Sequence, residues 1–278
     1  MLFHAIDVED DPTLHLPRVL CLHGGGSNAR IFRAQCRKFS QRLQSHFRLV
    51  FVEAPFLSQA GPCVLSVYST WGPFKRWLPW APGDPHTEPT ASAIDDAIQH
   101  AMDEDDAKGA TGEWVSLMGF SQGAKVCASL LFRQQVLVDQ GRQTLATPAW
   151  VAKENFRFAV LLAGRGPLLW MEPGQDPARP LEAHHASSTM TAGWTDHHST
   201  LMVNYKWENT LRLPTIHVHG LQDPDIDLHR LLFERCCQRE TARLVEWDGD
   251  HRVPLKPRDV EAVVDRIFEI ARQTGILQ

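Results

Sequence analysis

The chain has 278 residues, of which 43% are hydrophobic, enough to bury one large core, so we expect residues 1–278 to form a single domain. Its 28 basic and 33 acidic residues leave a formal net charge of -5 without a long Lys or Arg run, which argues against a nucleic-acid partner. The acidic N-terminus has no secretory signal and no apolar stretch approaches the roughly 18 residues of a membrane span, so we expect a soluble, cytoplasmic protein.

Six short runs rich in apolar, β-branched or aromatic residues predict core strands. They are residues 18–22, 49–53, 114–118, 158–163, 215–219 and 244–247. Segments with helical character lie between them, at residues 29–43, 91–107, 122–138, 226–239 and 258–274. This alternation predicts an α/β protein with a mostly parallel central sheet and helices on both faces.

Two segments interrupt the alternation and are rich in loops, residues 54–90 and 164–213. Each follows the C-terminal end of a predicted strand, where open α/β sheets place their ligand crevice. We therefore expect these segments to form the walls and lid of a pocket. Six tryptophans in them either line an apolar acyl pocket or pack beneath the loops: Trp71, Trp77, Trp80, Trp170, Trp194 and Trp207.

The strongest motif is Gly119-Phe120-Ser121-Gln122-Gly123, which lies between a predicted strand and a predicted helix. A strand, a sharp turn and a helix form the geometry of a nucleophile elbow, in which the serine has strained backbone and the glycines leave room for neighbouring chain. The pattern alone can arise by chance, but its context predicts Ser121 as a nucleophile.

A serine hydroxyl needs a base and a group that orients this base. His251 follows the predicted strand 244–247 by four residues, and Asp223 follows the strand 215–219 by the same interval. Parallel strands would bring both residues to the sheet edge that carries Ser121, in the chain order Ser, Asp, His of α/β-hydrolases. We predict Asp223 as the acid that orients His251; Asp225 and Asp227 lie close to it in the chain and are the alternatives.

The oxyanion of a tetrahedral intermediate needs two preorganised N–H donors. We expect one from the backbone of Gln122 and the other from Gly25, with Gly24 as the alternative, in the glycine-rich loop after the first strand. This loop lacks the Gly-Lys-Ser/Thr ending of a phosphate-binding loop and the glycine spacing of a dinucleotide fingerprint, so we expect no cofactor.

The sequence gives no indication of a metal site. The pairs His184-His185 and His197-His198 have no HExxH or carboxylate partner pattern, and we interpret them as solvated loop residues. The six cysteines have no zinc-type spacing and are expected to be reduced; they are Cys21, Cys36, Cys63, Cys127, Cys236 and Cys237.

The chain as a whole resembles the FSH family of serine hydrolases, particularly fungal members that release polyketides as thioesterases. Besides the serine motif, the resemblance rests on Arg18 to Gly24, Val52 to Phe56, Pro214 to Gly220 with Asp223, and Gly249-Asp250-His251. It implies an α/β-hydrolase fold and a cofactor-independent hydrolase for an acyl ester or thioester, with a substrate bound to the carrier protein of a polyketide synthase as one form. Cyclisation or condensation at the same triad, and ligand binding without catalysis, are the alternatives.

Overall fold

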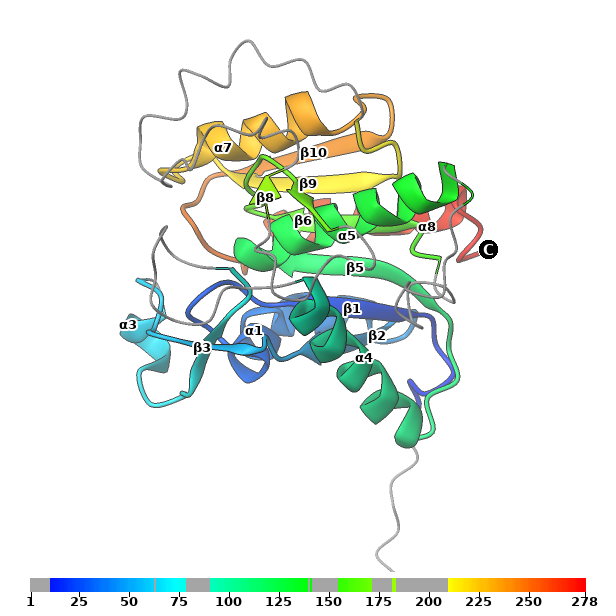
Figure 1. Ribbon diagram of the computed structural model, residues 1–278, viewed down its shortest axis with the longest axis horizontal. Helices are drawn as coiled ribbons and strands as arrows, with labels where there is room; N and C mark the ends of the chain where they lie inside the picture. Colours follow the sequence, from blue (N-terminus) through cyan, green and yellow to red (C-terminus); the bar gives the residue numbers. More distant parts are fainter. Residues whose placement is uncertain are drawn as a thin grey trace, which may run out of the picture.

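A six-stranded sheet forms the centre of the computed structural model, which describes residues 11–62, 64–78, 91–139, 141, 155–171, 182–183 and 210–278. Its strand order is β10-β9-β6-β5-β1-β2, and every neighbouring pair is parallel (Figure 1). The strands are β1 (Arg18–Leu22), β2 (Arg48–Val52), β5 (Trp114–Phe120), β6 (Phe158–Leu162), β9 (Thr215–Gly220) and β10 (Ala242–Trp247). All six predicted strands thus lie in one sheet.

Helices cover both faces of this sheet. On one face lie α4 (Ala91–Ala107) and α5 (Gln122–Asp139), and on the other lie α1 (Ala29–Gln35), α2 (Arg37–Leu43) and α8 (Pro257–Gln273). Strand side chains alternate between the faces, so Leu20 packs with the first group of helices and Cys21 with the second. The predicted α/β-hydrolase fold is confirmed.

Two predicted helices differ from the sequence-based expectation. The helix predicted over residues 29–43 is two helices, because the chain turns at Cys36 and each half buries its own apolar residues. The helix predicted over residues 226–239 is a short α7 (Ile226–Leu231) that continues as a π-helix, η3 (Leu232–Cys236).

The loop-rich segments also contain short elements. Segment 54–90 contains the antiparallel pair β3 (Phe56–Ser58) and β4 (Phe74–Arg76), with α3 (Leu65–Tyr68) between them. Segment 164–213 contains the antiparallel pair β7 (Leu169–Trp170) and β8 (Glu182–Ala183). In the part of the chain that the structure describes, no helix is both long and apolar enough to cross a membrane.

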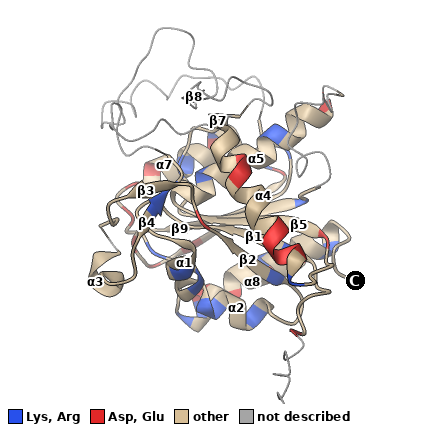
Figure 2. Cartoon of the chain, turned by 60° about the horizontal axis from the view of Figure 1, so that its bottom comes forward, with Lys and Arg blue, Asp and Glu red and all other residues tan. Residues whose placement is uncertain are grey.

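Helix α4 is fixed to its neighbours through buried carboxylates (Figure 2 colours the charged residues). Asp95 accepts two hydrogen bonds from the guanidinium of Arg133 on α5, at 2.7 and 2.9 Å. Asp105 bonds Arg48 of β2 at 2.8 Å and lies 3.5 Å from Arg18 of β1. Buried charges of this kind need partners, so the acidic helix is matched to arginines of the core.

Because Asp95 is buried, removing its partner should leave an uncompensated charge. We expect Arg133→Ala to lower the free energy of unfolding by about 3–5 kcal/mol, measured by urea denaturation. Arg212→Ala is the matched control, because Arg212 pairs with Asp139 at the exposed end of the same helix and should cost at most about 1 kcal/mol. Equal losses in the two variants would contradict this assignment.

Candidate active site

Ser121 occupies a sharp turn between β5 and α5. Its φ of 53° is in the left-handed region, which is strained for a residue with a side chain. Its backbone N–H donates to the carbonyl of Leu162 on the neighbouring strand at 2.9 Å, which fixes the turn to the sheet. A Cβ on Gly123 would lie 2.1 Å from the carbonyl oxygen of Leu22, so only glycine fits there. This is the geometry expected of a nucleophile elbow.

The structure brings Ser121, His251 and Asp223 together in one hydrogen-bonded row. Nε2 of His251 lies 3.0 Å from Oγ of Ser121, and Nδ1 of His251 lies 2.6 Å from Oδ2 of Asp223. The three residues follow the C-terminal ends of β5, β10 and β9, all on one edge of the parallel sheet. His251 therefore contacts a hydroxyl with one nitrogen and a carboxylate with the other.

The neighbouring aspartates have other partners. Asp225 forms an ion pair with Arg165, and its backbone N–H donates to Oδ1 of Asp223 at 3.0 Å. Asp227 lies in the first turn of α7, 3.8 Å from Arg230. Of these three acids, the structure places the predicted one, Asp223, against His251.

The environment of Asp223 keeps it ionised. Burial alone would raise the pKa of this carboxyl, but the hydrogen bonds from His251 and from the Asp225 N–H lower it below its ordinary value. His251 is less enclosed, with 18% of its side chain exposed, whereas the Asp223 side chain is fully buried. The carboxylate thus forms the interior end of the row and the serine hydroxyl the outer end.

The loop after β1 lies directly beside the turn that carries Ser121. A Cβ on Gly25 would lie 2.6 Å from the side chain of Gln122, whereas one on Gly24 would meet the ring of Phe120 at 2.9 Å. The N–H of Gly26 donates to the carbonyl of Lys75 at 2.9 Å. Among the residues that the structure describes, the N–H groups of Gly25 and Gln122 have no such partner.

The side chain of Gln122 fixes another segment to this turn. Its Oε1 accepts from the N–H groups of Trp77 and Leu78 at 3.2 and 3.3 Å, and its Nε2 donates to the carbonyl of Leu78 at 3.2 Å. The backbone of the predicted oxyanion donor is thereby held against the end of the segment that follows β4.

His23 organises the glycine-rich loop, a role that the sequence analysis missed. The buried imidazole accepts from the Ala54 N–H at Nε2, at 3.1 Å, and therefore carries its proton on Nδ1, which donates to the carbonyl of Gly24 at 2.7 Å. Its own carbonyl accepts from the indole N–H of Trp77 at 2.8 Å. A histidine directly after a strand and before the glycines was the available signal.

Three further buried histidines, also missed, continue from Asp223 into the interior. Nε2 of His229 lies 3.7 Å from Oδ2 of Asp223. The ring of His219 lies 5.5 Å from that of His229, and the ring of His217 lies 6.0 Å from that of His219. Burial lowers the pKa of His217, His219 and His229 to about 3, 4 and 3, so all three are neutral at pH 7. The pattern His-x-His in a core strand was the sequence signal for His217 and His219, whereas His229 had none.

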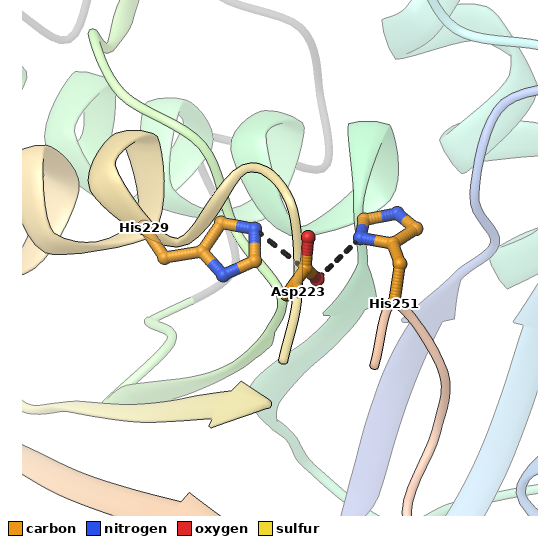
Figure 3. Close-up of side chains that lie close together, drawn as sticks. All are labelled: Asp223, His229 and His251. Atoms are coloured by element: carbon orange, nitrogen blue, oxygen red, sulfur yellow. Dashed lines mark hydrogen bonds and ion pairs between the residues drawn. The ribbon is translucent and has the colours of Figure 1, made fainter. Parts of the chain in front are cut away.

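The ligand atoms of Asp223, His229 and His251 lie within 4.8 Å of one another, as in a metal site (Figure 3). Two ligands of a tetrahedral first-row cation are about 3.3 Å apart, because metal–ligand bonds are about 2.0–2.2 Å long. The 2.6 Å between Asp223 and His251 is shorter and suits a charge-assisted hydrogen bond. We therefore interpret this cluster as a hydrogen-bonded system.

Part of the predicted pocket lies outside the described residues. Of the six tryptophans, Trp77 is fully buried and Trp71 packs against Arg30. Trp80, Trp194, Trp207 and the side chain of Trp170 lie outside the described part, as do His184, His185, His197 and His198. The walls and lid at 54–90 and 164–213 stay a prediction.

The chain is similar to several known proteins. The family model described as serine hydrolase (FSH1) matches residues 13–263. The chain is 53% identical to esterase citA of Monascus ruber, over 97% of each chain, and 51% identical to esterase claE of Penicillium crustosum, over 96% and 97%. Acyl-protein thioesterase 2 of Zea mays aligns at 15% identity over 92% and 94%, with a TM-score of 0.48, which is too low to bear on the reaction.

The buried histidines should make stability depend on pH. Their pKa values are lowered to about 3–4 in the folded protein, whereas the unfolded chain takes up protons near the ordinary 6.5. Stability is therefore full above about pH 6.5 and is lost as the pH falls towards 4, by up to about 4 kcal/mol per pH unit for three protons. Urea denaturation over this range measures the slope.

One of these histidines provides the control for that slope. In His217→Leu, the slope should be smaller than in the wild type by about 1.4 kcal/mol per pH unit, because one proton no longer distinguishes the two states. An unchanged slope would show that His217 is not buried in its neutral form.

Proposed function

Because the chain belongs to the FSH1 family of serine hydrolases, we propose that Ser121, His251 and Asp223 are its catalytic triad, acting through an acyl-enzyme on an ester or thioester. The observation that carries this proposal is the row of two hydrogen bonds, 3.0 and 2.6 Å long, that ends on a serine with φ of 53°. A strained turn presents the hydroxyl, and an imidazole bonded to a carboxylate receives its proton.

The proposed reaction uses each group in turn. Oγ of Ser121 attacks the acyl carbonyl while Nε2 of His251 takes the hydroxyl proton, and Asp223 holds the resulting imidazolium through Nδ1. The N–H groups of Gly25 and Gln122 stabilise the oxyanion. When the tetrahedral intermediate collapses, His251 returns the proton to the leaving alcohol or thiol. A water molecule, deprotonated by His251, then cleaves the acyl-enzyme to the free acid.

For the substrate we propose an acyl thioester on the carrier protein of a polyketide synthase, cleaved in fungal secondary metabolism. Support comes from the sequence resemblance and from relatives named as esterases, about half identical over nearly their whole length.

The surface beside the glycine-rich loop also suits an apolar acyl group. Gly61 donates its N–H to the carbonyl of Gly26, so the segment from β3 to α3 packs on that loop. This segment exposes Leu57, Leu65 and Val67 by 65%, 54% and 69%. We propose that these three exposed side chains contribute to the surface that contacts the acyl group.

Substitution of the proposed nucleophile tests the triad. We expect Ser121→Ala to lower kcat/KM for a p-nitrophenyl ester by at least about 10⁴-fold and to abolish labelling by a fluorophosphonate probe. Ser116→Ala is the matched control, because Ser116 lies on the same strand with its hydroxyl bonded to the carbonyl of Phe158, and it should label like the wild type. Labelling of Ser121→Ala would place the nucleophile elsewhere.

Product analysis tests the substrate and the outcome. With a carrier protein loaded with a polyketide-type acyl thioester, we expect the wild type to give a free carboxylic acid and a free carrier thiol, detected by mass spectrometry. Ser121→Ala should leave the thioester intact. A cyclic product would favour cyclisation over hydrolysis, and turnover of simple esters without any release from the carrier would exclude the carrier-bound substrate.

A further inference from the structure

The proposed triad leaves the three histidines behind Asp223 without a role. A strand of a parallel sheet is buried on both faces and is normally apolar throughout. On β9, Ile216 and Val218 follow this rule on one face, but His217 and His219 take the corresponding positions on the other. Burying an imidazole nitrogen without a hydrogen bond destabilises the fold. Among the described residues, both nitrogens of His219 and of His229 have no such partner, whereas Nε2 of His217 lies 3.0 Å from the Thr215 hydroxyl.

His229 is the member of this group that reaches the triad. Oδ2 of Asp223 bonds His251 on one side and faces Nε2 of His229 at 3.7 Å on the other (Figure 3). Oδ1 of the same carboxylate accepts the Asp225 N–H. The imidazole of His229 is fully buried, and neither of its nitrogens has a hydrogen-bond partner among the described residues. It therefore lies against the carboxylate without any competing contact there.

The surrounding elements fix His229 in this place. The residue lies on α7, where the carbonyl of Leu228 accepts the N–H of Gly166 from the loop after β6. The π-helix η3 that follows turns Phe233 onto the rings of His217 and His219, at 5.1 and 6.2 Å. The ring of His219 on β9 lies 5.5 Å from that of His229, so strand, helix and loop pack together around this residue.

The protonation state of His229 and its neighbours decides whether His229 can donate an N–H to Asp223. Three titratable or charged groups face the Asp223–His229 pair, namely His251, His219 and Arg165. Arg165 forms an ion pair with Asp225. Further away, burial and the charge of Arg230 lower the pKa of His219, and His217 lies next to His219. Burial keeps His229 neutral, its pKa lowered to about 3. A neutral imidazole supports an anion only through an N–H, which must then be on the nitrogen that faces Oδ2.

We propose that His229 is a positioning residue for the triad: its Nε2–H supports the Asp223 carboxylate on the side opposite His251, holding it ionised and in place to orient His251. The proposal rests on the triad proposed above. The N–H faces the same carboxylate oxygen that binds His251. It therefore makes Asp223 a weaker acceptor and reduces the stabilisation that Asp223 gives to protonated His251. Activity therefore persists to lower pH than it would without His229.

Substitutions at His229 test this role through the pH profile. In His229→Leu, which removes the N–H, we expect the midpoint of the acid limb of kcat/KM to move up by about half a pH unit or more, with about a 3–10-fold loss at pH 7. His229→Gln keeps an N–H donor at similar volume and should restore most of the wild-type midpoint. A merely structural role would change stability without moving the midpoint, and an unmoved midpoint in His229→Leu overturns the proposal.

His217→Leu is the matched control, because it removes the same group from the same cluster two rings further from Asp223. It should keep the wild-type acid limb. An equal shift in both Leu variants would assign the effect to the cluster as a whole and would overturn the specific role of His229.

The wild-type protein carries a second test, which does not depend on folding of the variants. The ¹⁵N chemical shifts of His229 should show the proton on Nε2 above pH 5, and a proton on Nδ1 would overturn the proposal. Fluorophosphonate labelling of Ser121 separates the two proposals. An unlabelled wild type refutes the triad itself, whereas normal labelling with an unmoved acid limb refutes only the role of His229.

Discussion

The site depends on one close contact, between the turn after β5 and the end of β1. Gly123 approaches the carbonyl of Leu22 so closely that no side chain fits between them, and this contact holds Ser121 in a left-handed conformation. Such backbone costs about 1–2 kcal/mol and persists only where packing enforces it. Here α5 enforces it, because nearly all of its first three turns are buried against the sheet. The strain of one residue is therefore supported by the packing of a whole helix.

Buried charge is handled in two different ways on the two sides of the molecule. The carboxylates of α4 are paired with arginines, which fixes the helix. Asp223 instead has imidazoles around it, one from the active site and one from α7. An arginine in place of His229 would hold the carboxylate more firmly, but its charge would oppose the imidazolium that the proposed reaction forms on His251. Neutral donors allow the carboxylate to remain available to that cation.

The sequence was most informative where a residue is tied to the end of a strand. Strand ends of a parallel sheet meet at one edge, so Ser121, Asp223 and His251 could be brought together from their intervals alone. The interval after the strand also favoured Asp223, but Asp225 and Asp227 remained alternatives because their positions depend on how one turn folds before α7. The break at Cys36 and the π-helix likewise follow from packing that no local pattern reveals. The histidines were overlooked because contacts between positions 217 and 229 arise only in the folded chain.

Gln122 connects two parts of the site, one through its backbone and the other through its side chain. Its backbone belongs to the turn that presents Ser121, while its side chain fastens Trp77 and Leu78. Trp77 and Leu78 are thus held at a fixed position relative to Ser121. Because one residue makes both connections, the turn that carries Ser121 and the segment that ends at Leu78 cannot shift independently of each other.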